Sequence, residues 1–317
     1  MDERVLGRTG LRVSAIGLGT LTWGRDTEAD TAAELLGTFV EAGGSLVDTA
    51  ASYGDGAAEL LLGTLIGEVA ERDDLVLVTK AGVRRAATGS LADTSRRALL
   101  DSLDASLTRL RTDHVDVFCV QQPDAVTPAD EVARTLEHIL DSGRARYVAL
   151  ANHPAWRTVR VADLLAPQRL AAVEVEYSLL QRGVEREVLA AAREIGAGVL
   201  AWSPLGRGVL TGKYRRSVPA DSRAASAHLS GFVEPYLGSA AAPVVEAVVT
   251  AADGLGCAPL EVALAWVLAR DIASAIVGAR TPAQLRPVLA SSLVLPPEIV
   301  TALDEVSAPA LGYPERR

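Results

Sequence analysis

The chain has 317 residues, of which 49% are hydrophobic and 22% charged; this composition is typical of a globular protein and excludes a disordered, fibrous or disulfide-held chain. The net charge of −9 argues against nucleic acid or an anionic membrane as a partner, and no apolar run approaches the ~20 residues of a membrane span. Because the N-terminal segment is charged and has no apolar signal region, we expect a cytoplasmic protein.

Short apolar segments alternate with helical patterns along the whole chain, after a hairpin that turns at Thr9 and Gly10. Each apolar segment is a nearly continuous hydrophobic run, as expected for parallel strands that are covered on both faces. The expected strands are residues 15–20, 45–49, 75–80, 115–121, 147–152, 170–178, 198–203 and 274–279. The expected helices are residues 31–41, 57–70, 95–110, 128–141, 158–165, 184–195, 244–255 and 281–289.

Eight strands, each followed by a helix except for extra elements before the eighth, predict an α/β protein: a (β/α)8 TIM barrel that forms a single domain over residues 1–317. The alternative is a doubly wound open sheet, but no G-x-G-x-x-G follows the first strand.

Two segments are longer than the usual connections between strands and helices. Residues 207–242 form a long loop after strand seven, on the face where barrels carry active sites, and residues 296–306 form an extra C-terminal helix.

Some residue types are scarce enough to be informative. Only two of the 31 basic residues are lysines, Lys80 and Lys213, and they are candidates for sites that need a compact ammonium; chance survival on the surface is the alternative. The two cysteines, Cys119 and Cys257, lie far apart without metal-ligand spacing. We therefore expect two buried free thiols and no metal site.

The ends of strands two and three carry residues suited to acid–base chemistry. Asp48 and Tyr53 follow strand two, and Lys80 ends strand three, so a barrel brings all three to its C-terminal rim. There Asp48 pairs with Lys80, and the ammonium lowers the pKa of the Tyr53 phenol. Such a phenol is a competent general acid for an oxygen whose carbon receives a hydride. Taken one at a time, the same residues also fit a capping acid, rim packing and a solvated strand end.

Several motifs then occur in order: D-T-A-x-x-Y-G at residues 48–54, V-T-K at 78–80, A-W-S-P-L-G-R-G-V-L-T-G-K-Y at 201–214 and V-G-A-R-T-P-A-Q-L at 277–285. With these motifs the chain resembles the aldo-keto reductase superfamily, in particular the potassium-channel beta subunits and the bacterial oxidoreductases similar to them. The resemblance runs from Val5 to about Val306. It implies a (β/α)8 barrel that binds NADPH (or NADP+) across its mouth and transfers a hydride to a carbonyl.

The resemblance also implies roles for individual residues. Tyr53 would be the proton donor, Asp48 and Lys80 its tuning pair, Trp202 the stacking partner of nicotinamide, and Arg280 the cation for the adenosine 2′-phosphate. The other implied cofactor contacts are Gly19, Thr20, Ser203, Pro204, Leu205, Arg207, Lys213, Arg223, Gly278, Ala279, Thr281 and Gln284. A guanidinium beside a helix N-terminus is in any case a sound anion site.

The chain also departs from the pattern that it resembles. Gln121 stands where the usual fourth catalytic residue is a histidine, and an amide can donate a hydrogen bond but cannot carry a proton. Asn152 is retained among the residues that would bind the carboxamide of nicotinamide. Glu174 replaces the usual glutamine there and would accept a hydrogen bond from the carboxamide NH2. Pro287 and Val288 replace the usual adenine contacts.

His153, near the mouth, is open to two interpretations: a substitute for the missing histidine, or a rim histidine with solvent or backbone partners. The leading functional hypothesis is an NADPH-dependent reductase of a carbonyl on a small or medium-sized metabolite. The alternatives are a reductase of C=N or conjugated C=C bonds in a biosynthetic intermediate, and a cofactor-binding regulatory or sensor protein with weak turnover. The oligomeric state, including a homo-oligomer, stays open.

Overall fold

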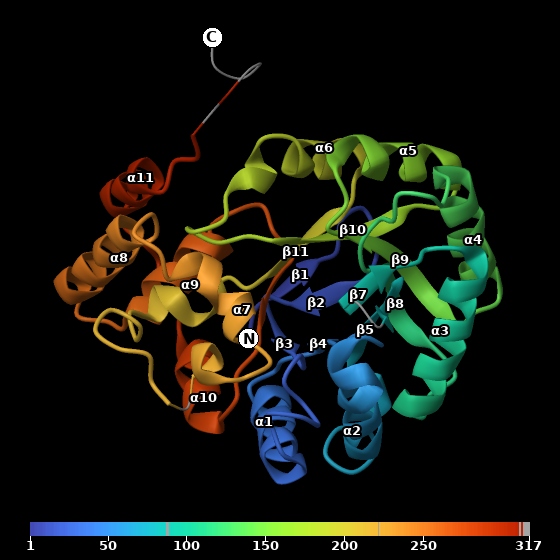
Figure 1. Cartoon of the computed structure of the whole chain (residues 1–317), viewed down its shortest axis with the longest axis horizontal. Coiled ribbons are helices and arrows are strands. Elements are labelled where there is room, and N and C mark those ends of the chain that lie inside the picture. The colour runs from blue at the N-terminus through green and yellow to red at the C-terminus, as the bar shows by residue number, and fades with distance from the viewer. Residues whose placement is uncertain (87–88, 221, 311, 313–317) are drawn as a thin grey trace.

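The computed structural model describes residues 1–86, 89–220, 222–310 and 312, and it confirms the predicted α/β architecture. Eight parallel strands close into a barrel in the order β10-β11-β12-β3-β4-β5-β8-β9, with helices around it (Figure 1). The barrel strands are β3 (Ile16–Gly19), β4 (Leu46–Asp48), β5 (Val76–Ala81), β8 (Val115–Val120), β9 (Ala145–Ala151), β10 (Leu170–Glu176), β11 (Gly198–Trp202) and β12 (Ser274–Val277). This is the (β/α)8 TIM barrel expected from the sequence.

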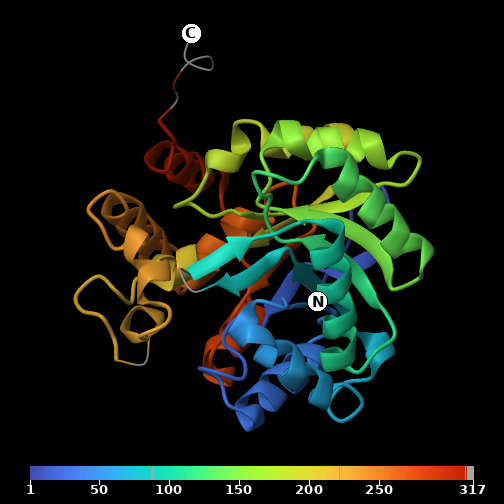
Figure 2. The same cartoon turned by 45° about the vertical axis from the view of Figure 1, so that its right-hand side comes forward.

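The helices that cover the barrel bury one apolar stripe each against the strands. They are α1 (Ala29–Glu41), α2 (Ala57–Leu65), α3 (Arg96–Leu110), α4 (Ala129–Asp141), α5 (Ala155–Leu165), α6 (Val188–Ile195) and α10 (Pro282–Ala290). In Figure 1 they follow one another around the strands, and Figure 2 shows the same ring turned by 45°. The predicted helix over 57–70 ends earlier, at Leu65, because the chain turns at Gly67, whose φ is +84°.

The N-terminal hairpin closes one end of the barrel. It consists of β1 (Glu3–Val5) and β2 (Arg12–Ser14), paired antiparallel around the predicted turn. Its Leu6 and Val13 are fully buried in the apolar cluster that fills the barrel interior. The opposite end, where the strands reach their carboxyl termini, is therefore the open end.

The long connection between β11 and β12 contains more structure than expected. It holds the short helix α7 (Ser230–Val233), α8 (Ala242–Leu255) and α9 (Pro259–Leu268), of which only α8 was predicted. A second hairpin, β6 (Val83–Ala86) and β7 (Gly89–Ala92), follows β5 and was not predicted either. The final helix α11 (Pro297–Val306) packs against α8, as an extra element outside the barrel.

No single helix in the described ranges is long and apolar enough to cross a membrane; α8 and α9 together meet that test by length and composition only, and they are bent by 102° at their break. The described cysteines are both free, as expected, although Cys257 is only half-buried.

Candidate active site

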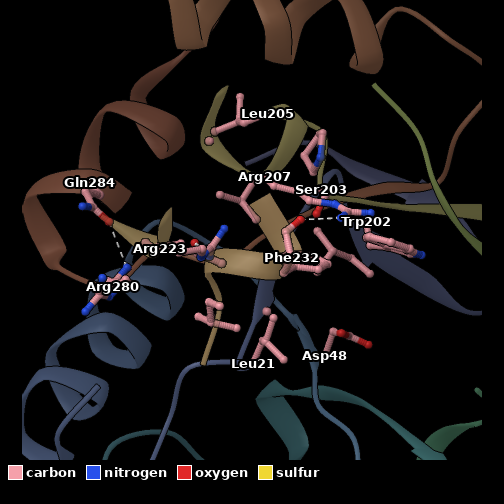
Figure 3. Close-up of a pocket in the computed structure, with 18 of the residues that line it drawn as sticks. Leu21, Asp48, Trp202, Ser203, Leu205, Arg207, Arg223, Phe232, Arg280 and Gln284 are labelled. Atoms are coloured by element: carbon pink, nitrogen blue, oxygen red, sulfur yellow. Dashed lines mark hydrogen bonds between the residues drawn. The ribbon is translucent and has the colours of Figure 1, made fainter. Parts of the chain in front are cut away.

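A cavity of about 740 Å³ opens at the carboxyl ends of the strands and runs from the barrel axis out beneath the β11–α8 segment. It collects side chains from β4, β5 and β10, from the loops after β8, β9 and β11, and from the start of α10. Figure 3 shows its two ends: Asp48 and Trp202 lie on one side, and Arg223, Arg280 and Gln284 on the other. Parallel strands explain this arrangement, because all their carboxyl ends meet at one face.

At the inner end, Lys80 forms an ion pair with Asp48 and donates a 3.0 Å hydrogen bond to the backbone oxygen of Thr49. Both charged side chains are 2–3% exposed. Burial alone lowers the pKa of Lys80, but Asp48 and Glu174 raise it well above its usual value, so the ammonium stays charged. The predicted Asp48–Lys80 pair is confirmed.

Tyr53 lies half-buried in the loop after β4, at the start of the short 3-10 turn that leads into α2, with the Lys80 ammonium 5.3 Å from its ring centroid. The predicted lowering of its pKa is wrong. Burial raises the pKa of Tyr53 above its usual value, Lys80 opposes this, and Asp48 and Glu174 raise it further. The prediction considered the Lys80 cation alone; burial, which is the largest cause, and a second carboxylate outweigh it, and the phenol keeps its proton at neutral pH.

Glu174 is that second carboxylate. It lies on β10, 2% exposed, with Oε1 3.2 Å from the Lys80 ammonium and with Oε2 lacking a hydrogen-bond partner among the described residues. Burial raises its pKa to about 7, and the nearby Asp48 adds to the rise, while Lys80 opposes it. We refer to Asp48, Lys80 and Glu174 as the buried charge cluster.

Gln121, Asn152 and Trp202 line the same cavity as the cluster and are linked to one another by hydrogen bonds. Gln121 accepts a 2.9 Å hydrogen bond from Ser52 through Oε1, so its NH2 end is the one left to donate into the cavity. Asn152 donates to the backbone oxygen of Gln121 at 2.9 Å and accepts from the Trp202 indole at 3.1 Å. The bond to Asn152 fixes the Trp202 indole at the end of β11.

His153 does not replace the missing histidine. It is 5% exposed, its Nδ1 lies 2.8 Å from the backbone oxygen of Ala151, and it is not among the residues that line the cavity. Burial lowers its pKa to about 4, which keeps the ring neutral near pH 7. Of the two interpretations, the structure supports the rim histidine with a backbone partner.

At the outer end of the cavity, Lys213, Arg223 and Arg280 converge, and we call these three residues the cationic rim. Arg223 donates to the backbone oxygen of Gly278, and burial and then the nearby Arg280 lower its pKa, although Tyr214 opposes the shift. The Arg280 amide donates to Gln284 at 3.0 Å in the first turn of α10 (Figure 3). Several cations beside a helix N-terminus make a binding site for anions.

Arg207 behaves differently from the cationic rim. Its guanidinium makes two hydrogen bonds to Glu176, at 2.7 and 2.6 Å, and lies 4.0 Å from the Phe232 ring centroid. Phe232 in turn stacks on Trp202 at 6.3 Å. The Arg207 charge is thus already paired, and its side chain fastens the β11–α8 segment to the end of β10.

The sequence located most of this cavity. The lining includes every predicted catalytic residue and every predicted cofactor residue except Thr20 and Thr281. Thr20 is fully buried and donates to the Asp48 backbone oxygen at 3.0 Å, while Thr281 is the exposed residue before α10. The sequence analysis did not predict Leu21, Leu229, Phe232, Leu260 and Ile276 as lining residues; they carry no motif, and only the fold brings these apolar side chains here.

Backbone conformation also marks the mouth of the barrel. Asp55, Asn152, Ser203 and Arg207 are four of the five non-glycine residues with positive φ among the described residues, and all four lie on loops after barrel strands. Such strained conformations cluster at functional sites. The signal lies in the backbone and could not be read from the sequence.

A (β/α)8 barrel with a buried acid–base cluster and a cationic rim at its carboxyl end has the features of an enzyme active site. Comparison with known proteins identifies the class. Residues 15–308 match the family model described as "Aldo/keto reductase family", and the chain belongs to this family of oxidoreductases. It is also 34% identical over 320 residues to the uncharacterized oxidoreductase YrpG of Bacillus subtilis (strain 168), with 96% of each chain covered.

Proposed function

We propose that the protein is an NADPH-dependent oxidoreductase that reduces the carbonyl group of a small or medium-sized metabolite, with Tyr53 as the proton donor. The observation that carries the proposal is a single cavity with an acid–base group at one end and a cationic rim at the other. Family membership supports an oxidoreductase.

The outer end of the cavity fits the phosphates of a dinucleotide. Lys213, Arg223 and Arg280 place three positive charges along this part of the cavity wall. A side chain at Gly278 would put its Cβ 2.8 Å from the Arg223 guanidinium, so a glycine keeps this approach open. In our proposal Arg280 pairs with the 2′-phosphate that distinguishes NADPH from NADH.

The inner end fits a nicotinamide ring and a carbonyl. When bound, the cofactor supplies a hydride to the carbonyl carbon. Trp202 offers an aromatic face, and Asn152 and Glu174 offer polar atoms beside it. Tyr53, protonated at neutral pH, donates its proton to the carbonyl oxygen, while the Gln121 NH2 group steadies that oxygen with a hydrogen bond.

A second candidate function is a cofactor-binding sensor with weak turnover. Two observations favour it: Gln121 takes the place of a proton-carrying residue, and the apolar Pro287 and Val288 line the outer part of the cavity. A reductase of C=N or conjugated C=C bonds is a variant of the leading proposal, since an amide at Gln121 suits more than one acceptor.

Single-turnover kinetics tests these functions. The protein is loaded with NADPH and mixed with aldehydes, ketones, imines and enones in turn, and the absorbance of the reduced nicotinamide is followed against a mixture without acceptor. We expect rapid oxidation with at least one carbonyl compound. Oxidation only by imines or enones would favour the reductase of C=N or conjugated C=C bonds. NADPH binding without oxidation by any acceptor would favour the sensor. An absence of NADPH binding would overturn the proposed function.

A further inference from the structure

The buried charge cluster has an unbalanced composition. Lys80 is the only cation in it. Its ammonium makes the shorter contact with Asp48, while the Glu174 Oε1 lies 3.2 Å away. The second oxygen of Glu174 is buried and has no hydrogen-bond partner among the described residues. Two carboxylates thus share one ammonium, and the cluster carries an extra negative charge whenever both are ionised.

No other charged group compensates Glu174 within the described barrel. The titratable groups that face it are Asp48 from β4, Lys80 from β5, Cys119 from β8 and Tyr53 from the loop after β4. Burial raises the pKa values of Cys119 and Tyr53, so both are neutral near pH 7. The neighbouring strands β9 and β11 pair with Glu174 through Ala151 and Leu200, which are apolar.

The charge of Glu174 is variable in the physiological range. Its pKa lies at about 7, mainly because the carboxyl is buried, so the cluster passes from neutral to singly negative as the pH rises through neutrality. Glu174 also lines the cavity, together with Asn152 and Trp202, at the end where the proposed function puts the nicotinamide. A charge in this poorly solvated position acts on a neighbouring ligand with little screening.

We propose that Glu174 makes the site select the oxidation state of the cofactor: its carboxylate strengthens the binding of NADP+, whose ring is positively charged, relative to NADPH, whose ring is neutral. The inference rests on the proposed function. It follows by linkage that NADP+ binding expels a proton from Glu174 near neutral pH, whereas NADPH binding does not. Tighter binding of the oxidised form also makes the bound NADPH a stronger hydride donor.

Binding measurements without a substrate test this inference. Dissociation constants for NADP+ and NADPH are measured by titration calorimetry at pH 6 and pH 8. Their ratio is the readout, because a titration of the 2′-phosphate affects both cofactors alike. We expect the ratio for wild type to move towards NADP+ by roughly tenfold between the two pH values. Buffers of different ionisation enthalpy should report proton release with NADP+ alone.

Two variants separate charge from shape. Glu174→Gln keeps the shape of the side chain and removes its charge. The ratio of its NADP+ and NADPH dissociation constants should be independent of pH. At pH 8 the variant should favour NADP+ less than wild type does. Glu174→Asp keeps a carboxylate at the same position and should retain the pH dependence. Circular dichroism confirms that each variant is folded.

The outcomes distinguish the inference from the function on which it rests. If wild type binds both cofactors with a ratio that does not change with pH, or if Glu174→Gln behaves like wild type, the selection by Glu174 is wrong and the proposed function stands. If wild type binds neither cofactor, the proposed function is wrong, and the inference about Glu174 is then wrong as well.

Discussion

The buried charge cluster and the cationic rim are both groups of charged residues in one cavity, yet the fold holds them in opposite ways. Lys80 and its two carboxylates extend from neighbouring or facing barrel strands and are 2–3% exposed. The residues of the cationic rim come from the β11–α8 segment and the turn before α10, and Lys213 among them is exposed. The barrel strands fix the charged groups of the cluster and remove them from water, whereas the loops present the charges of the cationic rim at the wall of the cavity, where a ligand can reach them. Substitutions in the two regions should therefore have different effects on catalysis, stability and cofactor binding.

The largest expected effect concerns catalysis at the inner end. Tyr53→Phe removes the hydroxyl of the proposed proton donor but keeps the ring, so the rate of carbonyl reduction should fall by about 10²- to 10⁴-fold, the usual contribution of general acid catalysis. Affinity for NADPH should stay within about twofold of wild type, because the phenol makes no contact in the cationic rim. Stopped-flow oxidation and fluorescence titration measure the two quantities. Undiminished reduction by the variant would remove Tyr53 from the mechanism.

The only two lysines of the chain allow a matched test of stability. Lys80→Met leaves two buried carboxylates without their cation, which should lower the free energy of unfolding by about 3–5 kcal/mol at pH 8. The loss should shrink at pH 5, where the carboxyls can take up protons. Lys213→Met, at the cationic rim, should change stability by less than ~0.5 kcal/mol and should weaken NADPH binding instead. Urea unfolding measures the free energy of unfolding of both variants. Equal losses of stability in the two variants would contradict the contrast between the two regions.

A smaller effect is expected for recognition of the 2′-phosphate. Arg280→Ala should weaken NADPH binding by roughly 10- to 150-fold, the range for a charge-assisted hydrogen bond, and should leave NADH binding unchanged. Arg286→Ala is the control, because Arg286 lies six positions further along the chain, within α10, where it pairs with Glu34 at 3.0 Å on the surface. Fluorescence titration of both variants with both cofactors gives the answer. An equal loss for NADH would show that Arg280 does not contact the phosphate.

The smallest effect is a pH-dependent change in thermal stability. Because burial raises the pKa of Glu174 from 4.5 to about 7, the folded protein holds this proton more tightly than the unfolded chain does. Its contribution to stability is fully present below the lower value and is lost as the pH rises through about 7. Glu174→Gln should thus raise the melting temperature by a few degrees at pH 8.5 relative to wild type, and by less at pH 5. Calorimetric melts at the two pH values measure the shift; a shift that is the same at both would argue against a buried titrating carboxyl.

Particular residues show how far the sequence reaches into the site. Asp48, Tyr53 and Lys80 could be brought together in advance, because each directly follows or ends an apolar strand and all such ends meet at one face. The direction of the Tyr53 pKa shift could not be predicted from the sequence, because it depends on burial and on Glu174. Glu174 lies 121 positions further along the chain than Tyr53. The pairing of Arg207 with Glu176 was missed for the same reason: it joins a loop to a strand that is distant in the sequence.

The sequence by itself determined the eight buried strands, most of the helices and the position of the motif residues at the barrel mouth, because hydrophobic periodicity and turn residues act over a few neighbours. The β6–β7 hairpin and α9 were not predicted, although Pro259 and Glu261 in the first turn of α9 are typical helix-start residues. Only the tertiary structure decided that Glu174 shares Lys80 with Asp48, that Phe232 covers Trp202 and that His153 faces a backbone oxygen. These contacts, and the pKa shifts that follow from them, depend on which side chains barrel closure places together and how much water it removes from them.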